Sequence, residues 1–341
     1  MTVYFVPWDA NQNLLLETER LYEKAKTFNN IEKDDLVAVK LHVGELGNPN
    51  YVQPFFVHHI IQKIKDAGGK PFLTDSNTLY HAQRHNAYDH IQTAIMNGFN
   101  MAPFIVADGL KSENSHTIKT HGILKEIQVS GAIAQADAMI VITHCKGHDL
   151  SGFGGAIKNI AMGCTTREGK LQQHRTVNLE INQTKCTGCT TCKTACPNNL
   201  PQIINNKAHI TSPLCMRCPI CTSECPTNAI QFTNKENLSK ALASATLGVL
   251  KTFKPQKVTY INFAKDITQH CDCLPNPGTP ITNNIGIFAA NSPVSIDAAF
   301  LKKINYQQLF NKPSNVDCMT QITEAINIGI PGETNPTIQQ I

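Results

Sequence analysis

The sequence is poor in aromatic residues and has no long hydrophobic run. Aromatic side chains make up 6% of its 341 residues, and there is one tryptophan. The longest apolar stretch compatible with a helix, residues 241–250, is far shorter than the roughly 20 residues that cross a bilayer. Lysine and arginine form no dense stripe, and such a stripe is the electrostatic mark of nucleic-acid binding. We therefore expect no membrane span and no nucleic-acid partner.

The N-terminus also lacks a basic segment that leads into an apolar stretch, and residues 1–7 are typical of a short strand instead. Thirteen cysteines without a secretory signal indicate reduced thiols in the cytoplasm. In that compartment, metal binding is a commoner use of clustered cysteines than disulfide formation. The sequence therefore predicts a cytoplasmic protein that uses its cysteines as ligands or reactive thiols.

Eight of the thirteen cysteines fall in two identical runs. Residues 186–197 and 215–226 both read C-x2-C-x2-C-x3-C-P, and each cysteine of the second run lies 29 positions after its counterpart in the first. This is the spacing of two-cluster ferredoxins, in which the fourth cysteine of each run binds the other cluster. A zinc ribbon would need two pairs of ligands rather than two sets of four, and a disulfide framework does not suit this compartment.

We therefore expect two 4Fe-4S clusters as cofactors, because a cubane needs one thiolate for each iron and soft sulfur ligands suit it. The crossing rule divides the eight ligands between the clusters. The first cluster is assigned to Cys186, Cys189, Cys192 and Cys225, and the second to Cys215, Cys218, Cys221 and Cys196.

The rest of the chain alternates between strand-like and helix-like segments, which favours an α/β fold with a mostly parallel sheet. Strands are expected at 1–7, 36–42, 71–74, 104–107, 138–143, 257–263 and 285–289, helices at 57–65, 88–96, 156–162, 238–253 and 295–310, and a polar loop at 111–121. The simplest organisation is an α/β domain (1–177 and 236–341) interrupted by a ferredoxin-like double-cluster module (178–235). Three consecutive small domains are the alternative.

A second site is predicted after the buried strand at 138–143, because ligands bind at the carboxyl ends of strands in such sheets. The loop that follows contains His148, a glycine-rich segment at 151–155 and Lys158. The glycines alone are equally consistent with a tight strand-to-helix connection. The histidine can act as an acid, a base or a ligand, and the lysine can bind an anion. A small anionic substrate could also place its charged group at the N-terminus of the following helix.

Five cysteines lie outside the two runs. Cys271 and Cys273 are separated by one residue, so both sulfurs can lie on the same side of an extended segment. They could hold an additional metal with Cys164, His148 or His174, could exchange electrons as a disulfide, or could be two reduced surface cysteines. Cys318 is interpreted as a small hydrophobic residue, and His81 and His85 as loop residues.

Four segments together resemble a known family. They are KLHVGE (40–45), TDSNTLYHAQRHNA (74–87), THCKGHDLSGFGGAIKNIAMGC (143–164) and CDCLPNPGTPITNNIGIFAANSPVSIDAA (271–299). With the inserted double cluster, they resemble the family called domain of unknown function 362 (DUF362), whose members are described as iron–sulfur centre proteins. The resemblance implies the fold and the clusters, but no settled reaction.

A second, local resemblance is to the nickel-pincer lactate racemase family. His148, the loop 151–155, Lys158 and His174 are similar in order and spacing to that family's histidine, glycine loop, cofactor lysine and metal-binding histidine. The chain departs from the family pattern at residues 153–155 and at Met162-Gly163, where a proline is missing. The resemblance implies a site in the same cleft, and neither a nickel pincer nor a racemase.

These observations predict an iron–sulfur redox protein that passes single electrons to a site in the α/β cleft, as a reductase or a reductively activated enzyme. Its candidate catalytic residues are Lys158, His148, Cys271 and Cys273, and its partners are an electron-donor or electron-acceptor protein and a small anionic substrate. The alternative is a non-catalytic electron-transfer or cluster-delivery protein that docks a redox partner. A thiol–metal sensor based on Cys271 and Cys273 is a third hypothesis.

Overall fold

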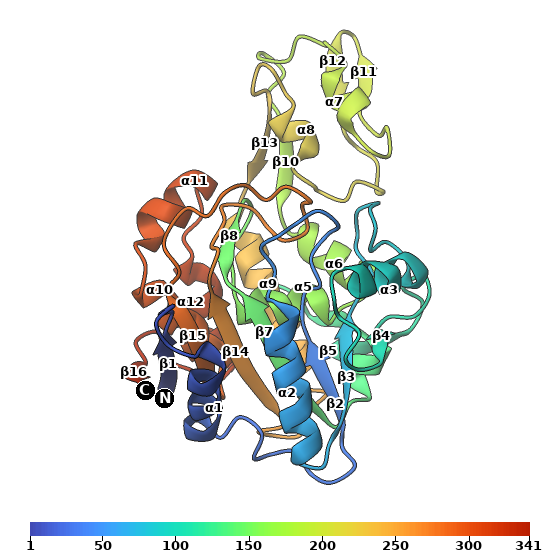
Figure 1. Ribbon diagram of the computed structural model, residues 1–341. Coiled ribbons are helices and arrows are strands. Elements are labelled where there is room, and N and C mark those ends of the chain that lie inside the picture. The colour runs from blue at the N-terminus through green and yellow to red at the C-terminus, as the bar shows by residue number, and fades with distance from the viewer.

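The computed structural model describes residues 1–341, whose core is an eight-stranded sheet of order β16-β1-β15-β14-β7-β2-β3-β4 (Figure 1). Only β15 runs antiparallel to its neighbours, so the expected α/β fold with a mostly parallel sheet is confirmed. The strands are β1 (Thr2–Pro7), β2 (Leu36–Lys40), β3 (Lys70–Asp75), β4 (Phe104–Val106), β7 (Ala138–His144), β14 (Val258–Ala264), β15 (Gly286–Ala290) and β16 (Thr337–Gln340).

Helices cover both faces of this sheet and create two hydrophobic cores. Strand β7 illustrates why a strand that is covered on both faces has a continuous apolar sequence. Its residues Met139 and Val141 point into the larger core, and Ile140 and Ile142 point into the smaller one. A strand covered on both faces needs apolar side chains in both directions. The smaller core packs against α1 (Leu14–Ala25) and α2 (Pro54–Asp66), and the larger against α5 (Ala156–Gly163), α9 (Glu236–Leu250), α10 (Pro293–Lys302) and α12 (Met319–Asn327).

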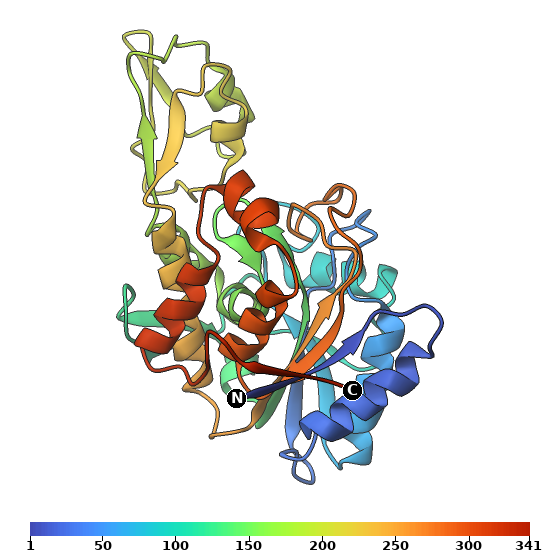
Figure 2. The same cartoon turned by 90° about the vertical axis from the view of Figure 1, so that its left-hand side faces the viewer.

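Residues 178–235, called the cysteine module below, lie outside the sheet and project from one end of the molecule (Figures 1 and 2). The chain enters and leaves this segment side by side, because Asn178 pairs with Thr233. The sheet takes strands from both sides of the module in the sequence. The module contains β10 (Asn178–Ile181), α7 (Thr191–Ala195), β11 (Gln202–Ile204), β12 (Lys207–His209), α8 (Ile220–Ser223) and β13 (Ile230–Thr233).

Two local predictions were wrong. The expected loop at 111–121 contains a strand, β5 (Ser115–Lys119), which pairs with β6 (Glu126–Ser130). Strand β5 is almost wholly exposed, so it needs no apolar periodicity and its sequence gives no strand signal. The single helix expected at 295–310 is divided into α10, which ends at Lys302, and a π-helical turn, η1 (Gln307–Asn311), that continues into α11 (Lys312–Ser314).

The remaining elements are short or lie at the edges of the sheet. They are α3 (Ala87–Met96), α4 (Gly131–Ala134), β8 (Lys146–His148), β9 (Gly152–Gly154) and α6 (Arg167–His174). None of the helices combines the length and the apolar character that a membrane crossing requires.

Candidate functional site

The cysteine module contains two open cavities, and each is lined by four cysteines. The first has about 300 Å³ of empty space and the second about 370 Å³. In both cavities three of the cysteines belong to one run and the fourth to the other run. The first is lined by Cys186, Cys189, Cys192 and Cys225, and the second by Cys196, Cys215, Cys218 and Cys221. These are the two groups of four that the crossing rule predicts.

The two runs also share their backbone geometry. Gly188 and Arg217 occupy equivalent positions, and both have a left-handed φ, of 70° and 55°. Further along, the backbone N–H of Leu200 donates to the sulfur of Cys196 at 3.5 Å. The equivalent N–H of Ala229 donates to the sulfur of Cys225 at 3.3 Å. The 29-residue repeat in sequence is therefore a repeat in structure, and backbone N–H groups in both halves point at cysteine sulfur.

The cysteines suit a cluster better than a single metal ion. Burial and the neighbouring Cys218 and Cys215 raise the pKa of Cys221 to about 12. Four negatively charged thiolates around this cavity would therefore repel one another unless the positive charge of bound iron offset them. No three His, Cys, Asp or Glu side chains lie close enough to hold one metal ion. A zinc ion would draw four sulfurs to about 2.3 Å from itself, whereas a cubane separates them because each binds a different iron. The residues present therefore fit two 4Fe-4S clusters.

A second group of side chains lies at the carboxyl end of the parallel strands. Five of the six other candidates from the sequence meet there, and they are called the edge site below. The Nζ atom of Lys158 lies 3.8 Å from the sulfur of Cys271. Burial and the charge of Lys158 lower the pKa of His148 well below its usual range and that of His174 to about 4. The edge site consists of His148, Lys158, His174, Cys271 and Cys273.

The two thiols of the edge site have different protonation states. A hydrogen bond from Cys273, together with the charges of Lys158 and Lys146, lowers the pKa of Cys271 well below its usual range. The same hydrogen bond and burial raise the pKa of Cys273. Cys271 is therefore a thiolate that accepts a hydrogen bond from the Cys273 thiol. Thiolates, not thiols, are the nucleophilic and electron-donating form of cysteine.

Asp272, between the two cysteines, fixes this loop to the sheet. Its carboxylate lies 2.9 Å from Nδ1 of His144 and 2.7 Å from Nζ of Lys146. Its backbone oxygen accepts a hydrogen bond from the N–H of Glu45 at 3.1 Å. Burial acts to raise the pKa of Asp272, but His144 and Lys146 hold it well below its usual range. The ionised carboxylate thus ties the loop of both cysteines to the end of β7 and the start of β8, and the backbone oxygen ties it to the segment that follows β2.

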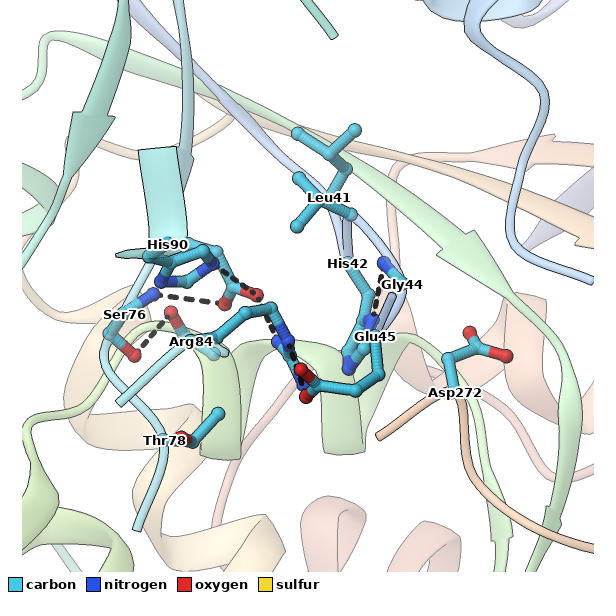
Figure 3. A network of polar contacts seen from close by, with 12 residues as sticks. Leu41, His42, Gly44, Glu45, Ser76, Thr78, Arg84, His90 and Asp272 are labelled. Carbon is cyan, nitrogen blue, oxygen red and sulfur yellow. Dashed lines mark hydrogen bonds and ion pairs between the residues drawn. The ribbon is translucent and has the colours of Figure 1, made fainter. Parts of the chain in front are cut away.

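A buried charge network beside the edge site was not predicted (Figure 3). Asp75, at the end of β3, pairs with Lys40 at 3.1 Å and with Arg84 at 3.3 Å. Arg84 also pairs with Glu45 at 3.3 Å and donates to the Tyr80 hydroxyl at 2.6 Å. A sequence signal existed, because Lys40 and Asp75 each end a buried strand, where side chains converge in parallel sheets.

Helix α6 connects the edge site with the cysteine module. Its last residue, His174, lies beside Lys158, and the backbone of Arg217 faces the His174 ring. The following residue, Arg175, donates to the backbone oxygen of Pro213 at 2.7 Å. The loop that leads into the second cysteine run therefore contacts the helix that carries an edge-site histidine.

The helix N-terminus expected to bind an anion is already occupied. The carboxylate of Asp297 accepts hydrogen bonds from the N–H groups of Ala156 at 2.7 Å and Ile157 at 3.0 Å. A Cβ atom at Gly155 would collide with this carboxylate. This loop glycine therefore serves an internal contact, and an anionic substrate group must be bound elsewhere.

The remaining candidates are placed apart from the edge site. Cys164 lies in the larger core, with its sulfur 3.9 Å from that of Met139, and it is not brought together with Cys271, Cys273 or His174 in a metal-binding group. Cys318 is buried in the same core, as expected. His81 and His85 lie in a loop with their ring centroids 4.0 Å apart.

Comparison with known proteins gives distant solved structures and one family. The lactate racemase apoprotein from Thermoanaerobacterium thermosaccharolyticum is 13% identical, with a TM-score of 0.42 over 85% of this chain and 53% of that one. A protein from Thermotoga maritima is 11% identical, with a TM-score of 0.39 over 87% of this chain and 58% of that one. The chain thus spans about half the length of these two structures. No curated protein matches it.

The family comparison covers most of the chain. The matching family model, described as "Domain of unknown function (DUF362)", extends over residues 37–302. That range includes β2 except for its first residue, all strands from β3 to β15, the cysteine module and all five residues of the edge site. The chain therefore belongs to the DUF362 family.

Proposed function

We propose that the protein is an iron–sulfur redox protein, in which the cysteine module holds two 4Fe-4S clusters and the edge site carries out the chemistry. The observation that supports this most is the pair of four-cysteine cavities, each completed by a cysteine from the other run. When bound, such clusters supply one-electron transfer. The protein would then be a reductase or a reductively activated enzyme, in the reducing compartment that its cysteine content predicts.

The side chains of the edge site have separable roles in this proposal. Lys158 is partly exposed, and it forms no ion pair with a carboxylate, in contrast to Lys40 and Lys146. It is the cation available to a small anionic substrate. His148 is neutral at physiological pH because its pKa is lowered by burial and by Lys158, so its imidazole can donate or accept a hydrogen bond to a substrate without carrying a charge. Cys271, as a thiolate, is the electron-rich group beside them.

The experiment that tests this proposal is electron paramagnetic resonance of anaerobically purified, reduced protein and of two cysteine variants. We expect the signals of two interacting clusters in the unmodified chain. Cys225→Ser should impair the first cluster although it lies in the second run, and Cys196→Ser should impair the second. If Cys225→Ser instead impaired the second cluster and Cys196→Ser the first, the ligand assignment would be wrong. If the unmodified chain gave no cluster signals, the proposal itself would be wrong.

The second candidate is an electron-transfer or cluster-delivery protein that docks a redox partner. It is favoured by apolar side chains exposed on the cysteine module, where Leu214 is 68% and Ile204 is 48% exposed. Exposed apolar side chains of this kind can form part of a contact with another protein. In this case, Leu214→Ser should slow electron exchange with a donor or acceptor protein, whereas Lys158→Met should leave that exchange unchanged.

A further inference from the structure

Cys271 and Cys273 differ from every other cysteine outside the module. Burial raises the pKa values of Cys145, Cys164 and Cys318, which is the behaviour of inert core thiols. Cys271 is also buried, yet its sulfur lies 3.8 Å from the Lys158 ammonium group, and the neighbouring Cys273 and Lys158 lower its pKa. A fold that needed only a small apolar residue at this position would have no use for that ammonium.

The loop around the pair is held from two directions. Asp272 is bonded to His144 and Lys146 of the β7 region, and its backbone oxygen accepts from Glu45. The backbone N–H of Leu274 donates a hydrogen bond to the backbone oxygen of Cys271 at 3.0 Å. The two sulfurs are thus kept adjacent by contacts that involve neither of them.

We infer that Cys271 and Cys273 form a reversible dithiol–disulfide couple, in which Lys158 pairs with the thiolate of Cys271 in the reduced state. In the reduction step, the S–S bond breaks and takes up two electrons. One proton binds to the sulfur of Cys273, and the sulfur of Cys271 remains an anion beside the Lys158 ammonium. The two electrons would come from two one-electron donors, a chemistry that 4Fe-4S clusters held by the eight cysteines of the cysteine module would supply.

The position of the couple suits this source of electrons. The loop between β14 and β15 that carries both cysteines lies at the end of the sheet nearest the module in both views (Figures 1 and 2). Arg175, the residue after α6, donates a hydrogen bond to the backbone oxygen of Pro213, two residues before Cys215. The adjacent His174 lies beside Lys158. The source of the electrons rests on the proposed function, whereas the existence of the couple does not.

The couple is tested on the anaerobically purified full chain with its cofactors. The protein is equilibrated in mixtures of oxidised and reduced dithiothreitol, its free thiols are alkylated, and its peptides are mapped by mass spectrometry. The oxidised protein is then titrated with a reduced viologen, a one-electron donor, and the electrons taken up per chain are counted. The same is done with Cys271→Ser, Cys273→Ser and Cys273→Ala, and with Cys318→Ala as a control outside the edge site. Circular dichroism verifies that each variant is folded.

We expect a Cys271–Cys273 disulfide that forms and disappears reversibly with the buffer. We also expect uptake of about four electrons per chain, two by the clusters and two by the disulfide. This uptake falls by half in the edge-site variants and is unchanged in Cys318→Ala. Absence of the disulfide at every buffer ratio, or equal uptake by the unmodified chain and Cys271→Ser, overturns the inference. A reversible disulfide in a chain without iron supports the couple and overturns the proposed function.

Discussion

At the scale of single residues, the edge site is governed by which charges are paired. Lys40, Lys146 and Arg84 each contact a buried carboxylate. Lys158 has only the sulfur of Cys271 within bonding distance. A lysine with a thiolate as its partner stabilises that anion and stays available to a substrate. Sequence reasoning identified Lys158 and both cysteines, but residue types in a loop could not show that their side chains meet.

Replacing Lys158 should change the acidity of Cys271. An opposite charge at this distance lowers a pKa by about 1–3 units, so Lys158→Met should move the midpoint of Cys271 alkylation upward in pH by about one unit or more. At neutral pH the variant then holds less thiolate and reacts more slowly with iodoacetamide. The measurement is the rate of Cys271 alkylation against pH, followed by peptide mapping. Lys158→Arg keeps the charge and should keep the low midpoint; an unchanged midpoint in Lys158→Met would exclude this ion pair.

The buried network around Asp75 should contribute strongly to stability. Asp75→Asn leaves Lys40 and Arg84 without one buried partner, which costs about 3–5 kcal/mol. Burial acts to raise the pKa of Asp75, but Lys40 and Arg84 hold it well below its usual range. Its contribution is therefore complete at neutral pH and is lost only as the pH falls through that low pKa. Urea denaturation at neutral pH measures the loss.

The matched control for this variant is the exposed ion pair between Asp34 and Lys70. Asp34→Asn removes a carboxylate of the same type from the surface, where an ion pair is worth about 0–1 kcal/mol. If the two variants lost equal stability, the network around Asp75 would be as weak as a surface pair.

At the scale of elements, the two cysteine runs reach the same loop shape with different residues. Gly188 adopts its left-handed φ without strain, whereas Arg217 adopts it with a side chain present. A Cβ atom at Gly188 would also lie 2.5 Å from the backbone oxygen of Asn206. The repeat was visible in the cysteine spacing, but this asymmetry depends on the β11–β12 turn, which no local sequence pattern relates to residue 188.

Because of this asymmetry, we expect substitutions at Gly188 and at Arg217 to affect cluster binding differently. Gly188→Ala should disturb the loop of Cys186, Cys189 and Cys192 and lower the iron content by about half, the share of one cluster. Arg217→Gly relieves a strained φ and should keep the full iron content. Iron analysis of both variants after identical anaerobic purification is the measurement. Equal iron content in the two variants would show that the loop geometry does not limit cluster binding.

The start of α5 predicts a pH effect. Burial raises the pKa of Asp297 to about 6, above the value of about 3.9 for an unfolded chain. The folded state therefore binds this proton more tightly, and stability from this group is present in acid and lost as the pH rises through about 6. The unmodified chain should lose on the order of 2 kcal/mol relative to Asp297→Asn between about pH 4 and pH 8.

The measurement is the unfolding free energy of both chains across this pH range, with Asp34→Asn as a control for losing one surface carboxylate. A difference between the unmodified chain and Asp297→Asn that does not change with pH would mean that Asp297 keeps an ordinary pKa.

At the scale of the whole molecule, the sequence predicted the class of fold better than it predicted the strands outside the centre of the sheet. Apolar runs such as 138–143 identify strands that are covered on both faces, and these form the centre of the sheet. Strands β5 and β16 are mostly exposed and polar, so no apolar pattern in their sequences marks them as strands. The same limit applies to the edge site, where Cys271 and Lys158 are 113 residues apart and meet only because β7 and β14 are adjacent.

The central claim is that the cysteine module holds two iron–sulfur clusters. The most direct test is to count iron, acid-labile sulfide, zinc and nickel per chain in anaerobically purified protein. Two 4Fe-4S clusters per chain predict about eight irons and about eight sulfides, with no stoichiometric zinc or nickel. Stoichiometric zinc without sulfide, or thirteen cysteines free of any metal after anaerobic purification, would contradict it.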